Sequence, residues 1–233
     1  MQLIIRFLFR DMILFIKRIF IPTIILMSLT ACAFGTREVS LSYPPQQNRE
    51  IDGVNVTDST GVSSPIAIKV HTFQNNRFKI DPVTSQKKTS TIIGNVRNGF
   101  YMKTADVITN QNLEEWITNA VKYELEKNGY NVVDTTQNNY TGHFWDLRGA
   151  MLNVYADAYF NYEGKVKLHL ILKQYGSNEV LIDKNYEGVY KEANFAATEK
   201  GYKDVLEKSL SNAIGLIISD FNNLPKKASR ETM

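Results

Sequence analysis

Residues 165–174 read KVKLHLILKQ, an almost strict alternation of polar and aliphatic residues. Successive side chains of a strand point to opposite faces of its sheet, so this alternation predicts a strand with one buried face. The predicted buried face comprises Val166, Leu168, Leu170 and Leu172. The opposite face comprises Lys165, Lys167, His169 and Lys173.

Two further strand patterns flank this one, at about residues 149–160 and 179–190. The gaps between the three patterns are short, and each contains a glycine, Gly164 or Gly176. Short glycine-containing gaps between strands are typical of β-hairpins. The three strands are therefore predicted to form an antiparallel meander.

Apolar residues recur at helical spacing in two places, at about residues 111–128 and 199–221. Asn110 and Thr198 are candidate N-caps, and Gly129 can end the first helix. Each helix has a single apolar stripe, so the expected fold is α+β: an antiparallel β-sheet with two amphipathic helices packed on one face. The first stripe comprises Leu113, Trp116, Ile117, Ala120, Val121 and Leu125; the second comprises Tyr202, Val205, Leu206, Leu210, Ala213, Ile214 and Ile217.

Three weaker patterns complete the predicted sheet. Residues 66–70 alternate as a strand does, residues 91–107 contain two glycines and can form a hairpin, and residues 130–134 lead out of the first helix as a short strand. His71 follows the first of these segments and is expected to point outward beside Lys69.

The N-terminal leader contains basic and then apolar residues and ends in LTAC, residues 29–32. A membrane-spanning helix needs about 20 apolar residues, and the apolar run after Arg18 is shorter. The leader is therefore predicted to be a signal peptide rather than a membrane helix. LTAC resembles the lipobox of bacterial lipoproteins, in which the thiol takes a diacylglycerol, the leader is cut before the cysteine and the new amine is acylated. A second apolar-basic block at residues 3–10 leaves both Met1 and Met12 as candidate starts.

These features divide the chain into four parts. The lipoprotein signal peptide covers residues 1–31, a lipidated tether 32–64, an α+β periplasmic domain 65–222 and a frayed tail 223–233, with leader and tether expected to be disordered. Cys32 is the single cysteine, so its lipidation leaves no thiol for a disulfide or a nucleophile. By resemblance to proteobacterial lipoproteins, an Asp after the cysteine would favour the inner membrane; Ala33 stands there and favours the outer membrane, with the protein facing the periplasm.

The charge distribution argues against nucleic acid as a partner. Removing the four basic residues and the one acidic residue of residues 1–31 from the totals of 27 and 24 leaves 23 of each. Nucleic-acid binding needs a clustered excess of Lys and Arg that neutralises phosphates. The predicted partners are therefore the membrane, through the lipid on Cys32, and an envelope protein.

Residues 112–221 resemble the YajG-like family of outer-membrane lipoproteins. The resemblance rests on the helix end EKNGY (126–130), the strand LNVYAD (152–157), the helix end ISDF (218–221) and, after the lipobox, LSYPP (41–45). The chain departs from the family in its loop at residues 74–90 and in its longer leader. The resemblance implies location and fold, and it supplies no catalytic residues.

The sequence contains no pattern typical of a catalytic or metal site. A hydrolase needs a base beside a nucleophile, and its three histidines, His71, His143 and His169, have no such context. No two histidines share a helix face at the spacing of a zinc site. We therefore expect no cofactor and no enzymatic activity, although a histidine clustered with a carboxylate would favour an enzyme.

One strand face offers a candidate interaction surface. Tyr155, Asp157 and Tyr159 share a face with Met151 and Asn153, opposite Leu152, Val154, Ala156, Ala158 and Phe160. Tyrosine is favoured at protein interfaces because it combines apolar area with a hydrogen-bonding tip, whereas ordinary cross-strand packing gives the same pattern. The leading hypothesis is a non-enzymatic envelope lipoprotein that acts as a protein-interaction or accessory module. The alternative is a carrier of a small apolar molecule or lipid.

Overall fold

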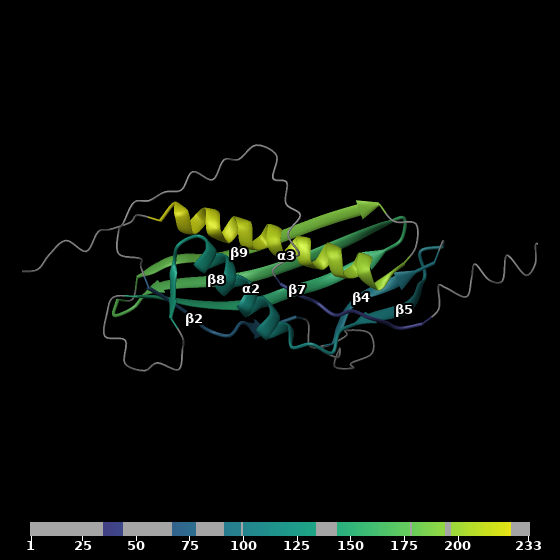
Figure 1. Ribbon diagram of the computed structural model, residues 1–233, viewed down its shortest axis with the longest axis horizontal. Helices are drawn as coiled ribbons and strands as arrows, with labels where there is room; N and C mark the ends of the chain where they lie inside the picture. Colours follow the sequence, from purple (N-terminus) through teal and green to yellow (C-terminus); the bar gives the residue numbers. More distant parts are fainter. Residues whose placement is uncertain are drawn as a thin grey trace, which may run out of the picture.

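Three long antiparallel strands form the body of the sheet in the computed structural model (Figure 1). They are β7 (Phe144–Ala158), β8 (Asn161–Gln174) and β9 (Val180–Ala193). β8 pairs with β7 on one side and with β9 on the other, so the predicted meander is confirmed. The structure describes residues 35–43, 67–77, 91–98, 100–133, 144–177, 179–193 and 197–224.

The other edge of β7 pairs with three short strands, one after another along its length. These are β2 (Ala67–Val70), β3 (Gln74–Asn75) and β4 (Ile92–Arg97), and all three run parallel to β7. β6 (Asn131–Val133) extends the sheet beyond β2, and β5 (Lys103–Ile108) extends it beyond β4 as an antiparallel hairpin. β1 (Arg37–Glu38) pairs in parallel with β5.

The sheet is therefore mixed, and the prediction of a purely antiparallel sheet was wrong. The parallel pairs join segments far apart in the chain: Ala67 pairs with Phe144, and Arg37 with Val107. Hairpins leave a local turn signal in the sequence, whereas a long crossover between parallel strands leaves none. The predicted hairpin at residues 91–107 is confirmed as β4 and β5.

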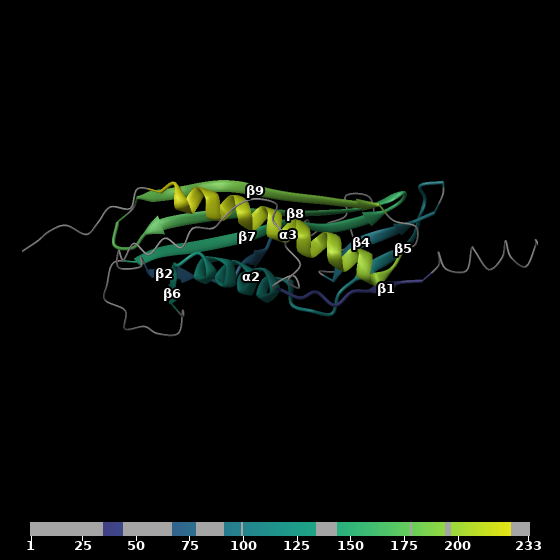
Figure 2. The ribbon, with the colours of Figure 1, turned by 45° about the horizontal axis from the view of Figure 1, so that its top comes forward.

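Both helices lie on one face of the sheet, as predicted (Figures 1 and 2). α3 (Glu199–Asn222) packs over β7, β8 and β9, and α2 (Leu113–Lys127) contacts α3, β6 and β3. Every residue of the two predicted apolar stripes is buried. Thr198 caps α3 as predicted, but the N-cap of α2 is Asn112 rather than Asn110.

Two glycines allow α3 to lie close to the sheet. A Cβ on Gly188 would lie 2.0 Å from the carbonyl oxygen of Ser209, and a Cβ on Gly164 would lie 2.3 Å from that of Val205. Backbone atoms cannot move aside as a flexible side chain can, so both strand positions exclude larger residues. The close approach brings the apolar face of α3 onto the buried face of β8.

A β-bulge at Leu152 changes the faces predicted for β7. Met151 pairs with Leu168 and Asn153 pairs with Lys167, so Leu152 is an extra residue without a partner on β8. A bulge exchanges the two faces of the strand beyond it. Met151 is consequently fully buried under the helices and Leu152 is only half-buried, contrary to the strict alternation expected there.

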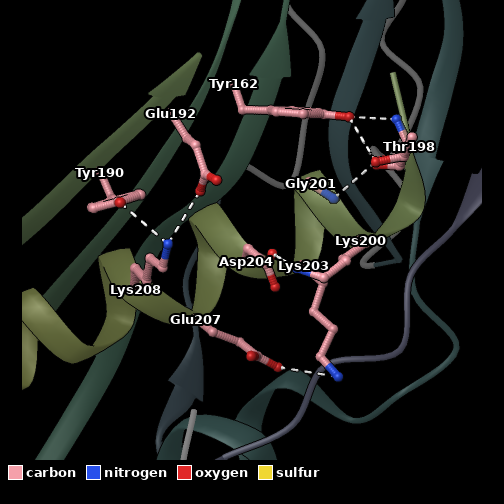
Figure 3. A network of polar contacts seen from close by, with 10 residues as sticks. All are labelled: Tyr162, Tyr190, Glu192, Thr198, Lys200, Gly201, Lys203, Asp204, Glu207 and Lys208. Carbon is pink, nitrogen blue, oxygen red and sulfur yellow. Dashed lines mark hydrogen bonds and ion pairs between the residues drawn. The ribbon is translucent and has the colours of Figure 1, made fainter. Parts of the chain in front are cut away.

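The first turns of α3 are held by polar contacts with β8 and β9 (Figure 3). The Tyr162 hydroxyl accepts a hydrogen bond from the backbone N–H of Thr198 and lies 3.2 Å from its carbonyl oxygen. Nearly three turns further on, Lys208 Nζ lies 3.2 Å from the Tyr190 hydroxyl and 3.1 Å from Glu192 Oε2. These contacts fix the start of α3 at one end of the sheet.

Residues 35–43 fall within the tether that was predicted to be disordered, but they lie against the folded domain, so that prediction was wrong for this segment. Val39 and Leu41 are buried in the core, and the Val39 N–H donates to the Ile108 carbonyl at 2.8 Å. The N–H and the hydroxyl of Ser42 donate to Glu207 Oε1 on α3 at 2.6 and 2.8 Å, and Trp116 Nε1 on α2 donates to the Ser42 carbonyl at 3.2 Å. This segment therefore joins the two helices. Cys32, the signal peptide and most of the tail lie outside the described residues, so their assignments stay predictions.

Candidate interaction surface at one end of the sheet

The predicted interaction residues Tyr155 and Asp157 lie on the outward face of β7 and contact the parallel strand β4. Asn95 pairs with Asp157 in the register of the two strands. Asn95 Nδ2 donates to the Tyr155 hydroxyl at 2.6 Å, and Arg97 Nε donates to Asp157 Oδ2 at 2.6 Å. The Arg97 and Asp157 side chains are 20% and 22% exposed, so both are largely engaged within the sheet.

The protonation states of this cluster follow from its contacts. Burial raises the pKa of the Tyr155 phenol, and the nearby Asp157 charge raises it further. The hydrogen bond with Asp157 raises the pKa of the Arg97 guanidinium. Tyr155 is therefore a neutral phenol and Arg97 a cation at neutral pH, which suits a structural link and gives no acid or base for catalysis.

Tyr159 belongs to a different, more exposed group at the end of the sheet. Its ring makes an edge-to-face contact with Tyr101, with centroids 5.1 Å apart, and lies 4.1 Å from the ring of Phe160. Tyr101 lies in the turn between β4 and β5, where the Arg97 guanidinium lies 4.1 Å from its ring centroid. We call Phe100, Tyr101, Met102, Tyr159 and Phe160 the apolar tip.

The apolar tip includes residues that the sequence reasoning missed or misplaced. Phe160 was expected on the strand face opposite Tyr155, but β7 ends at Ala158 and Phe160 lies in the turn before β8 with 70% of its surface exposed. Phe100 and Met102 were not singled out. The sequence does contain a signal for this exposed group: three large apolar residues follow Asn98 and Gly99, a pair typical of turns. A tight turn cannot bury all three side chains.

Tyr101 has a backbone φ of 64°. For a residue with a Cβ this left-handed conformation costs about 1 kcal/mol, and such strain persists where surrounding contacts determine it. Its amide donates to the Asn98 carbonyl at 2.9 Å, and its carbonyl accepts from Arg97 Nη1 at 3.1 Å. The turn therefore has a defined conformation with its apolar side chains exposed.

Ion pairs between neighbouring strands lie along the rest of the outward sheet face, which also contains exposed Val189. Lys165 Nζ lies 2.7 Å from Glu187 Oε1, and Lys167 Nζ lies 4.0 Å from Glu187 Oε2. Among the described residues, no helix covers this face, since α2 and α3 lie on the opposite side (Figure 2). Tyr155 and Asp157 thus lie within a broad polar surface.

Two histidines pair with aspartates on this face. His71 Nε2 lies 2.5 Å from Asp146 Oδ1, and His169 Nε2 lies 2.7 Å from Asp183 Oδ1. A His–Asp pair is part of a catalytic triad, but the triad also needs a nucleophile on the imidazole. Within the part of the chain that the structure describes, neither imidazole has a hydrogen bond with a Ser, Thr or Cys side chain. His143 lies outside that part.

Neither a metal site nor an apolar ligand cleft is apparent in the described ranges. They contain no group of three or more His, Cys, Asp or Glu side chains able to hold a metal ion. A surface depression of about 440 Å³ lies between β3 and the start of α2, and one of about 320 Å³ lies between β9 and the end of α3. Most residues lining the first, Asn75 and Glu114 among them, are polar, whereas ligand clefts are mostly apolar.

No family model matches the chain, and no curated protein does. Among solved structures, protein XCC0632 from Xanthomonas campestris, of the DUF330 family, has a TM-score of 0.45 at 9% identity and covers 79% of this chain and 92% of its own. The hypothetical protein CT253 from Chlamydia trachomatis has a TM-score of 0.45 at 6% identity, over 69% and 98% of the two chains. Lipoprotein GNA1162 from Neisseria meningitidis has a TM-score of 0.34 at 10% identity, over 68% and 96%.

Likenesses of this size establish no shared function, so the functional argument rests on the residues of this chain. The resemblance to the YajG-like family stays a prediction. In the described segments, no helix has the length and apolar character needed to cross a membrane.

Proposed function

We propose that this protein is a lipid-anchored lipoprotein of the outer membrane that faces the periplasm and binds another envelope protein without catalysing a reaction. The observation that carries the anchor is the leader, basic and then apolar, which ends in LTAC at the single cysteine, Cys32. Folded sequence begins by Gly35. A basic and apolar leader that ends at a lipobox cysteine distinguishes a lipoprotein from other exported proteins.

The observation that favours a protein partner is the outward face of β7, β8 and β9. The strands have 15, 14 and 14 residues, and the helices lie on their other face. The face is mostly polar, it contains ion pairs such as Lys165–Glu187, and it contains half-buried Tyr155 and Asp157. Protein interfaces mix such polar groups with tyrosine, whereas a lipid carrier needs an enclosed apolar cavity.

The alternative function, a carrier of a small apolar molecule or lipid, has less support. The space between the helices and the sheet is filled by side chains that are fully buried. They include Leu168, Leu170, Leu206, Leu210, Tyr186 and Tyr202.

Photo-crosslinking in living cells tests the protein-binding proposal. A benzophenone amino acid replaces Lys167 at the centre of the outward face or, as a matched control, Leu216 on the solvent side of α3. The Lys167 side chain is 39% exposed, and residue Leu216 is 50% exposed. We expect a discrete crosslinked protein, identified by mass spectrometry, from position 167 and none from position 216. The same adducts from both positions, or none from position 167, would argue against a partner on this face.

A further inference from the structure

The end of the sheet that contains the apolar tip exposes four large apolar side chains to solvent. Phe100 is 84% exposed, Phe160 70%, Met102 57% and Tyr101 56%. Tyr159 contacts both Tyr101 and Phe160 from the same end. A cluster of apolar side chains on a solvent-exposed protein surface marks a site that contacts another molecule or a membrane.

The register of the strands places the start of the folded chain at the same end. Arg37 pairs in parallel with Val107. The chain before Arg37 therefore lies beside the start of β5, which is Lys103, next to the turn that contains Tyr101. Figure 2 shows β1 beside β4 and β5 at this end of the sheet. The burial of Val39 and Leu41 holds this entry point in place.

Only three residue steps separate Gly35 from Cys32. An extended chain spans at most about 3.6 Å per residue, so Cys32 lies within roughly 11 Å of Gly35. If the acyl chains of Cys32 lie in a bilayer, the domain cannot move far from it. The end of the sheet with the apolar tip must then lie close to the lipid headgroups.

We propose that the apolar tip inserts into the interfacial region of the membrane that holds the Cys32 lipid. This inference rests on the proposed lipidation of Cys32. Aromatic side chains are favoured at the boundary between headgroups and acyl chains, because an apolar ring and a polar end each find a matching environment there. The insertion orients the domain, with the long strands directed away from the membrane and the outward sheet face open to the periplasm.

The charges around the tip indicate an apolar rather than an electrostatic contact. Arg97 pairs with Asp157, and Lys103 Nζ lies 2.5 Å from Asp106 Oδ1. Binding to anionic headgroups through unpaired Lys or Arg weakens as salt screens the charges. Contact through Phe100 and Phe160 is expected to be insensitive to salt.

Fluorescence quenching by brominated lipids tests the proposal on the full-length, lipidated protein. Phe160→Trp places the probe in the apolar tip. Tyr175→Trp is the matched control, because Tyr175 is 57% exposed in the turn at the other end of β8, about 45 Å away at roughly 3.3 Å per residue. Each variant is reconstituted in vesicles of phosphatidylethanolamine and phosphatidylglycerol with brominated acyl chains, and the emission of wild type, which contains buried Trp116 and Trp145, is subtracted.

We expect the tryptophan emission at position 160 to be at least twofold lower in brominated than in unbrominated vesicles, and to lie at shorter wavelength than the emission at position 175. The result should be the same at 50 and 500 mM salt, and the emission at position 175 should be unaffected by bromination. Equal quenching at the two positions, no quenching at position 160, or its loss at high salt would overturn the proposal. Vesicle flotation and the mass of the N-terminal peptide are measured on the same samples. A protein that floats and is acylated but is not quenched at position 160 contradicts the tip insertion alone, whereas a protein without acyl chains contradicts the proposed function as well.

Discussion

The Nε atom of Arg97 on β4 lies 2.6 Å from the Oδ2 atom of Asp157 on β7. This ion pair joins two parallel strands, and its two residues are 60 positions apart in the sequence. Arg97 also holds the turn of the apolar tip, through the Tyr101 carbonyl and ring. The pair therefore links the candidate interaction face to the exposed end of the sheet.

A double-mutant cycle measures this link. Because both side chains are mostly buried, Arg97→Ala and Asp157→Ala are expected to show a coupling free energy of about 1 kcal/mol in denaturant unfolding. The exposed pair Lys191–Glu163, with side chains 62% and 47% exposed at a distance of 3.0 Å, is the control. Its coupling should stay below about 0.5 kcal/mol, and equal coupling in the two pairs would contradict the structural role of Arg97–Asp157.

The close packing of α3 on the sheet can be tested at a glycine. Gly188→Ala should lower the free energy of unfolding by about 1–3 kcal/mol, because its Cβ would meet the backbone of Ser209 and Ala213. Gly215→Ala is the control within α3, where a new Cβ has nothing within 4 Å. It should raise the stability by up to about 1 kcal/mol through helix propensity. A neutral Gly188→Ala would mean that α3 does not approach β9 this closely.

The register of β8 predicts that two nearby positions contribute very differently to the stability of the fold. Leu170 is fully buried, and its truncation to Ala should lower the unfolding free energy by about 2–5 kcal/mol. Lys167 faces outward, and Lys167→Ala should change it by no more than about 0.5 kcal/mol. Chemical denaturation of both variants gives the comparison, and similar losses would show that the register is wrong.

Glu207 should give the protein a distinctive pH dependence. Burial raises the pKa of its carboxyl, and the hydrogen bonds from Ser42 oppose that shift. The folded state therefore holds the proton more tightly than the unfolded state. Stability from this group is highest below the ordinary Glu pKa and falls as the pH rises through the raised pKa of the folded protein. Glu207→Gln should lack this fall, as measured by unfolding midpoints across pH 3–8.

Asp220 provides a control of opposite sign. Hydrogen bonds from Lys184 and Tyr186 lower the pKa of its carboxyl. The contribution of Asp220 to folding stability is present above the ordinary Asp pKa and is lost as the pH falls through the lowered pKa of the folded protein. Asp220→Asn should therefore remove stability near neutral pH and not in strong acid. The same pH trend in the Glu207→Gln and Asp220→Asn variants would contradict the environments described for the two carboxyls.

Local patterns were enough to predict the meander, both helices and the face on which the helices lie. The alternation in KVKLHLILKQ and the apolar stripes of α2 and α3 involve residues close in sequence. In each pattern the apolar positions are the buried ones, so the pattern alone identifies the element and its buried face. The bulge at Leu152 was not predictable, because an extra residue on one strand changes the pairing without changing the apolar pattern on either side.

The candidate site was predicted only in part. Tyr155 and Asp157 lie on the outward face as expected, but their partners Asn95 and Arg97 come from a parallel strand that no local signal connects to β7. The pairing of β1 with β5 is equally non-local. It is the pairing that brings the start of the folded chain to the apolar tip.

The lipid on Cys32 is the central claim, and metabolic labelling with a radioactive fatty acid tests it most directly. Wild-type protein should incorporate the label and sediment with outer membranes. Cys32→Ser should incorporate none, because the single thiol is gone, and should either keep its uncut leader or be released as soluble periplasmic protein. One acyl chain holds a protein only marginally, at about 0.8 kcal/mol per buried methylene, so stable attachment needs the several chains of a mature lipoprotein. Label on the Cys32→Ser protein, or an unlabelled wild type, would contradict the account.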